Sequence, residues 1–367
     1  MKGKKLLRLL SATGVLIVAA SVLVVIDVAA GAPPAKAAAA GVLQSVPLRV
    51  DRMDPSVARI IPAHAELETV ADGFKWVEGP VWAQGSLFFA EIPSNSIRRW
   101  TPGHGVSIFL QPSGYQGKKP YGGPEPGSNG LTLDPEGRLT VAGHARRDVY
   151  RLESLNPHAQ ITILADSYHG KRLNSPNDLV YGPDGSLYFT DPPYGLRTQG
   201  DNDPRKELKV NGVYRIPDAS AQKPGAPPDR ARLQLLVSNL SRPNGIAFSP
   251  HGRYLYVDNT APQRLWMRYR MLPHGKLTDA KVLYDASSSK LPGAPDGMKV
   301  DEEGNIYSAG PGGVWIISPQ GKPLAILRIP KRVANLAWGG GDRKTLYIAA
   351  TDSIYRVHLN IPGEPVR

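Results

Sequence analysis

The 367-residue sequence contains no cysteine, which excludes disulfide bonds, thiolate metal sites and cysteine nucleophiles. It also lacks a G-x-S-x-G motif with ordered partners and a phosphate-binding G-K-S/T loop, so serine-hydrolase and P-loop chemistry are not expected. The formal net charge of +12 is scattered among acids and prolines, which argues against nucleic-acid binding. No amphipathic helix pattern is convincing after residue 66. With these classes of chemistry and a helical pattern set aside, the sequence favours a domain of short strands.

Residues 1–40 follow the order basic, apolar and small that is typical of an export signal. The apolar run over residues 9–26 is long for a cleaved signal and barely long enough to span a bilayer. Small-residue sites close behind it favour a cleaved signal peptide, and an uncleaved signal anchor is the alternative. In either case the rest of the chain is expected to be exported, either to the periplasm or out of the cell. It is expected to contact a membrane only through the anchor of the second alternative. Residues 41–66 are expected to form a linker.

A strand-turn-strand pattern recurs six times after the linker, and each unit begins with a polar residue that we call its head. The units span residues 78–91, 129–143, 177–191, 244–259, 296–310 and 335–350. Proline and glycine in several of the turns suit hairpins, because proline presets φ and glycine accepts a positive φ. The spacing leaves room for about four strands per repeat. The sequence therefore predicts an all-β fold, a six-bladed β-propeller with four antiparallel strands per blade over residues 67–367. A two-sheet sandwich is the alternative, but it does not explain why every head is polar.

The six heads are two carboxylates and four amides: Glu78, Asn129, Asn177, Asn244, Asp296 and Asn335. Equivalent positions in the blades of a propeller lie at equal distances from its axis, so these side chains are expected to converge at one mouth of the channel. Burying so many acceptor groups together is costly, and a divalent cation would relieve that cost. Carboxylate and amide oxygens suit Ca²⁺ best, while Mg²⁺ and Mn²⁺ remain open and Zn²⁺ is less well suited.

Four motifs make the sequence similar to a known family. They are EGPVW at 78–82, SPNDLVYGPDGSLYFTDPPYG at 175–195, PNGIAFSP at 243–250 and PDGMKVDEEGNIY at 295–307. With them, residues 67–360 resemble the SMP-30/gluconolactonase/LRE family of six-bladed propellers. The resemblance implies a hydrolase that opens a small-molecule sugar lactone with the help of one divalent cation. It also implies that Glu78, Asn244 and Asp296 hold the cation, and that Asn177 lies on the substrate side and is a further candidate ligand.

The expected chemistry assigns a catalytic role to Asp296, which would take a proton from the attacking water while the metal polarises the lactone carbonyl. Two loops, residues 111–128 and 166–176, are expected to cover the mouth of the channel. The candidate substrate-binding residues are Asn129, Asn177, His144, Lys119, Tyr121 and Arg172. Asp191 is expected to be structural.

Two other functions stay open on the sequence. One is a related metal-dependent hydrolase that acts on phosphotriesters or aryl esters. The other is a propeller without catalytic activity, which binds a sugar or a protein and uses Ca²⁺ only to brace its channel. The protein is expected to be a monomer or a weak oligomer.

Overall fold

The structure is a computed structural model and describes residues 44–366. The predicted export signal at residues 1–40 lies outside the described residues and stays a prediction. Between residues 44 and 366, no helix is both long enough and apolar enough to cross a membrane.

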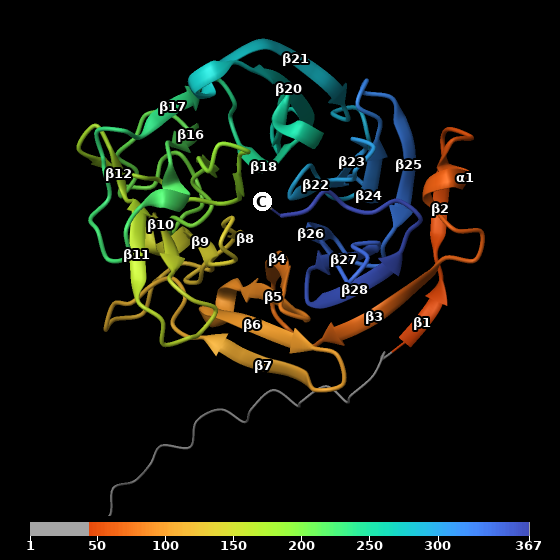
Figure 1. The fold of residues 1–367 in the computed structure, drawn as a ribbon, viewed down its shortest axis with the longest axis horizontal. Coiled ribbons are helices and arrows are strands. Elements are labelled where there is room, and N and C mark those ends of the chain that lie inside the picture. Colours follow the sequence, from red (N-terminus) through yellow and green to blue (C-terminus); the bar gives the residue numbers. More distant parts are fainter. Residues whose placement is uncertain (1–43, 367) are drawn as a thin grey trace, which may run out of the picture. The chain divides into compact units, whose positions relative to one another are not determined.

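Six sheets surround a central axis in the described part of the chain, which confirms the predicted six-bladed propeller with four-stranded blades (Figure 1). The first three blades are β4 (Val77–Ala83), β5 (Ser86–Glu91), β6 (Ser96–Thr101) and β7 (Gly105–Leu110); β8 (Leu131–Leu133), β9 (Leu139–Gly143), β10 (Asp148–Leu152) and β11 (Ile161–Ala165); and β14 (Leu179–Tyr181), β15 (Leu187–Asp191), β16 (Gly212–Ile216) and β17 (Gln234–Val237). Neighbouring strands in each blade are antiparallel, as hairpin connections require.

The remaining blades follow the same order from the axis outward. They are β18 (Pro243–Phe248), β19 (Tyr254–Asn259), β20 (Leu265–Met271) and β21 (Leu277–Asp285); β22 (Met298–Val300), β23 (Ile306–Gly310), β24 (Gly313–Ile317) and β25 (Pro323–Arg328); and β26 (Val333–Gly339), β27 (Thr345–Ala350) and β28 (Ser353–His358) with β3 (Glu66–Asp72). A separate ribbon pairs β12 (Ser167–Tyr168) with β13 (Lys171–Arg172), and 3-10 turns lie at Ile92–Ser94, His144–Arg146, Ala219–Ala221, Pro250–Gly252 and Pro273–Gly275.

The ring is closed by a strand from the amino-terminal side of the domain. Strand β3 precedes the first blade in sequence but pairs with β28 of the last blade, with Thr69 opposite Tyr355. The sixth sheet therefore contains both ends of the propeller domain, and its hydrogen bonds hold the first and last blades together. Closure packs the last blade face to face against the first, so neither of these faces is exposed as it would be in an open ring.

Aromatic side chains fill the spaces between adjacent blades. Trp82 of the first blade stacks on Tyr347 of the last, with ring centroids 5.2 Å apart. Tyr188 meets Phe248 edge to face at 4.9 Å between the third and fourth blades. Such rings bury large apolar areas, so the core lies in layers between the sheets rather than at the axis.

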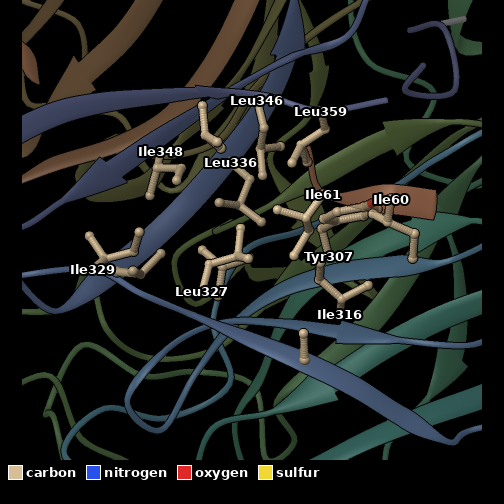
Figure 2. Packing of buried hydrophobic residues seen from close by; sticks show 14 of the residues in the cluster. Ile60, Ile61, Tyr307, Ile316, Leu327, Ile329, Leu336, Leu346, Ile348 and Leu359 are labelled. Atoms are coloured by element: carbon tan, nitrogen blue, oxygen red, sulfur yellow. The ribbon is translucent and has the colours of Figure 1, made fainter. Parts of the chain in front are cut away.

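The expected linker is structured from Gln44 onward, which corrects the boundary predicted at residue 66. Strand β1 (Gln44–Pro47) pairs with β3, and β2 (Arg49–Arg52) pairs with β25, so both extend the outer edges of the last two blades. The short helix α1 (Val57–Ile60) follows and directs Ile60 and Ile61 into the apolar cluster formed by these blades (Figure 2). The sequence signal was weak because each of these elements has only four residues.

Replacing Ile60 with alanine tests whether this segment belongs to the core. The side chain is 1% exposed, so its truncation is expected to lower the free energy of unfolding by about 2–5 kcal/mol. Met53 lies in the same segment but is 45% exposed, and its change to alanine should stay within about 0.5 kcal/mol. Denaturant unfolding of both variants measures the difference, and equal small effects would show that the segment contributes nothing to the core.

Candidate active site

The six heads lie where the innermost strands begin, and all are buried, with exposures between 2% and 6%. Asn129, Asn177 and Asp296 each stand two residues before their strands β8, β14 and β22. The other three heads lie within β4, β18 and β26, and the pairing of each of these strands shifts register beside its head. Such irregularities reorient side chains, which lets a residue inside a strand point toward the channel.

Five of the six heads line one cavity of about 290 Å³. The lining residues are Trp76, Glu78, Ile92, Glu125, Asn129, Asn177, Tyr194, Gln199, Asn244, Thr260, Asp296 and Arg332. The sixth head, Asn335, differs from the expectation. Its Oδ1 accepts a hydrogen bond from its neighbour Leu336 N at 2.8 Å, and its Nδ2 donates to Asp178 Oδ2 at 3.4 Å. These contacts hold Asn335 outside the cavity lining.

Glycines that follow the heads allow neighbouring blades to come close at this end of the channel. A Cβ atom would lie 2.4 Å from Asn129 O if added at Gly79, 2.5 Å from Asn177 O at Gly130, and 2.2 Å from Asp296 O at Gly245. In each case the obstructing atom belongs to the head of the next blade. The backbones of successive heads are thus in direct contact, and a side chain at these glycines would force them apart.

The variant Gly245→Ala tests this close contact. The added methyl group would meet the backbone of Asp296 and Met298, which has little freedom to move, so unfolding should become easier by about 1–3 kcal/mol. Gly341 is the matched control, because a Cβ there has no atom within 4 Å and its change to alanine should alter stability by less than about 0.5 kcal/mol. Chemical denaturation compares the two, and an unaffected Gly245→Ala protein would argue against tight contact between blades.

Buried carboxylates dominate the electrostatics of the site. Burial raises the pKa of Glu78 well above its usual value, and the nearby charge of Asp296 raises it further. Burial also raises the pKa of Asp296 to about 7, although the guanidinium of Arg332 opposes this rise. Asp258, behind the cavity on β19, has its pKa raised by burial and by Asp296. These groups repel one another when ionised, so the site favours a positive charge.

The cavity residues fit a hard divalent cation. Asn129 Oδ1 is buried and has no hydrogen-bond partner within the described part of the protein. Asn244 Nδ2 donates to Thr260 Oγ1 at 3.1 Å, which leaves its amide oxygen available to a ligand. Residues 44–366 contain no group of three or more His, Cys, Asp or Glu residues arranged to hold a metal. The donor set is instead two carboxylates with amide oxygens, a combination typical of Ca²⁺ and other hard ions.

Three of the predicted substrate-binding residues lie away from this cavity. Lys119 is exposed and borders a shallow pocket formed largely by its own loop and residues 93–95. Tyr121 is buried, and its hydroxyl donates to the backbone oxygen of Gly195. Arg172 is exposed on β13 and donates to Arg146 O at 2.7 Å. Tyr121 and Arg172 thus turn to structural partners, and Lys119 is exposed outside the cavity.

His144 lies behind the cavity wall rather than in it. Its ring is fully buried; Nε2 is 2.7 Å from Glu125 Oε2, and Nδ1 is 3.2 Å from Pro176 O. Glu125 itself lines the cavity, and its other oxygen accepts a hydrogen bond from Gln199 Nε2 at 2.8 Å. The sequence interpretation singled out His144 but not Glu125. The polar lining residues it also missed are Tyr194, Gln199, Thr260 and Arg332. Only Tyr194 had a signal, because it belongs to the DPPYG part of the long motif.

Asp191 anchors the segment that leads to Asn177. Its two side-chain oxygens accept hydrogen bonds from the backbone N–H groups of Asn174 and Ser175, both at 2.8 Å. Asn174 Nδ2 returns a bond to Asp191 O at 2.9 Å. Burial raises the pKa of Asp191 to about 7. These contacts match the structural role expected for Asp191, since they hold the backbone that positions a cavity residue.

Fold and site together define a six-bladed propeller with a polar cavity at one end of its channel, built from the heads of different blades. A sequence model of the SMP-30/gluconolactonase/LRE-like region matches residues 76–352. The chain therefore belongs to this family.

Several relatives match most of the length of the chain. It is 36% identical over 326 residues to a gluconolactonase from Zymomonas mobilis, covering 86% of this chain and 87% of that protein. It is 32% identical over 308 residues to a 6-deoxy-6-sulfogluconolactonase from Pseudomonas putida, covering 78% and 92%. Among solved structures, a gluconolactonase from Xanthomonas campestris superposes with a TM-score of 0.71 at 29% identity, covering 87% of this chain and 98% of that one.

Proposed function

We propose that the protein is an exported, metal-dependent hydrolase that opens a sugar lactone. The observation that carries the proposal is the convergence of Glu78, Asn177, Asn244 and Asp296, from four different blades, on one cavity. The gluconolactonase relatives support the choice of substrate class. A cavity of about 290 Å³ is at the small end of ligand sites, which suits a molecule of monosaccharide size.

The same four residues would hold one divalent cation. Ca²⁺ is the preferred ion, and Mg²⁺, Mn²⁺ and Zn²⁺ are the alternatives. When bound, such an ion polarises a carbonyl group and stabilises the negative charge that hydrolysis places on its oxygen. Glu78 and Asp296 would balance the double positive charge, and the cation would offset the burial that raises both pKa values and the charge of Asp296 that raises the pKa of Glu78 further.

Asp296 is the group in the cavity best suited to activate water. Its carboxylate would accept a proton as the water oxygen bonds to the lactone carbonyl carbon. Asn129 and Asn177 offer amide groups to the hydroxyls of the sugar, and Tyr194, Gln199 and Thr260 supply further polar atoms. Trp76 and Ile92 add apolar surface to the lining, against which the carbon skeleton of a lactone can rest.

The first test compares lactone hydrolysis by the wild-type protein and by the variant Asp296→Asn. Wild-type protein should release acid from a panel of aldonic and simple lactones, and the variant should lose about 10²- to 10⁴-fold in kcat, because an amide cannot take the proton. A pH-indicator assay measures turnover, and thermal unfolding checks that the variant stays folded. A phosphotriester and an aryl ester complete the panel. Turnover of those two without any lactone, or ligand binding without turnover, would refute the lactonase assignment.

Metal binding can be measured without any substrate. Ca²⁺ added to chelator-treated protein should raise the melting temperature; at a hundred times Kd the stabilisation is about 2.7 kcal/mol. The variant Glu78→Gln should need a much higher concentration, because it loses one of the two ligand charges. Glu136→Gln, which changes an exposed carboxylate in the turn between β8 and β9 that does not line the cavity, should respond as wild type does. No shift with Ca²⁺, Mg²⁺, Mn²⁺ or Zn²⁺ would refute the metal site.

A further inference from the structure

Glu125 and His144 form a hydrogen-bonded pair whose geometry requires one proton more than an ionised carboxylate and a neutral imidazole would hold. Nδ1 of His144 faces the carbonyl oxygen of Pro176, which can only accept, so this nitrogen carries a hydrogen. In a neutral imidazole the other nitrogen would then be an acceptor. It lies 2.7 Å from Glu125 Oε2, also an acceptor when ionised, and the contact is favourable only if a proton lies between them.

We propose that Glu125 is a second catalytic residue of the site and gives this proton to the ring oxygen of the lactone as it leaves. The proposal rests on the lactone hydrolysis proposed above. Glu125 lines the same cavity as Asp296, and its side chain retains 21% exposure, so it can reach a ligand. His144 has no exposed surface and acts as a positioning residue that stores and returns the proton through Glu125.

Surrounding contacts hold the pair in place. The loop that carries Glu125 is pinned at its base, where Tyr115 N donates to Pro126 O at 2.7 Å. The ring of His144 lies against Gly195, where a Cβ would come within 2.6 Å of its Cδ2 atom. Gln199 donates to Glu125 Oε1 at 2.8 Å and leaves a second lone pair on that oxygen. Gln199 thereby fixes the orientation of the carboxyl group, and Oε2, which shares the proton with His144, is the oxygen that passes it to the ligand.

The two carboxyl groups divide the reaction between them. Asp296 takes a proton from water while the water oxygen bonds to the carbonyl carbon. The bond from that carbon to the ring oxygen then breaks, and the ring oxygen receives the proton from Glu125. The product is a hydroxy acid. Asp296 then loses its proton to solvent, and the Glu125–His144 pair regains one, so atoms and charges balance.

The kinetic test compares leaving groups. The ring oxygen of an aliphatic lactone leaves as an alkoxide and needs a proton donor. The ring oxygen of an aryl lactone such as dihydrocoumarin leaves as a phenolate, whose conjugate acid has a pKa of about 10. In Glu125→Gln, kcat for the aliphatic lactone should fall by about 10²- to 10⁴-fold, with a loss of less than about tenfold for the aryl lactone. His144→Gln should show the same preference with KM unchanged, and Glu136→Gln should match wild type on both. Formate should restore activity to Glu125→Ala.

Proton NMR tests the stored proton without substrate. Wild-type protein should give a far-downfield signal from the short hydrogen bond, and Glu125→Gln should lose it. If the wild type opens no lactone, the proposed function fails, whatever the signal. If it does open lactones, a missing signal, equal losses on both lactones, or failure of formate to rescue Glu125→Ala would each overturn the role of Glu125.

Discussion

Repulsion between carboxylates buried at one end of the channel is the interaction on which the rest of this site depends. Glu78, Asp258 and Asp296 each have a pKa raised first by burial, and the charge of Asp296 adds to the rise in the other two. Such a cluster is unfavourable in isolation and becomes favourable when a cation shares it. Holding these groups together therefore lowers the stability of the fold, and this strain serves the site.

The propeller keeps them together by two simple means. Pairing of β3 with β28 closes the ring, so the blades cannot spread apart. Glycines such as Gly130 and Gly245 then let the backbone of one blade touch the head of the next. Aromatic packing between the sheets supports the ring from outside the channel. Precise placement of the polar groups therefore comes from backbone contacts, which move less than long side chains do.

The proposed chemistry uses two carboxyl groups, one as a proton acceptor and the other as a proton donor. Asp296 belongs to the ring of heads and would accept a proton, while Glu125 belongs to a loop and would donate one. Their different partners suit these roles. Asp296 is buried among other acids, and Arg332 opposes the rise in its pKa. Glu125 is hydrogen-bonded to His144 and Gln199. In this proposal the propeller would supply the cation site, and the loops would supply the groups that adapt it to a substrate.

The sequence by itself determined the repeating parts. Six polar heads at one register, each before a hairpin, were enough to predict the blades and to bring Glu78, Asn177, Asn244 and Asp296 together, because a repeat places equivalent residues at equivalent positions. Only the tertiary structure decided the parts that do not repeat. Tyr121 bonds to Gly195 and Glu125 to His144 across 74 and 19 residues of chain, and β3 finds β28 from the other end of the domain. Such contacts depend on the path of each loop through space, and no local pattern of residues encodes that path.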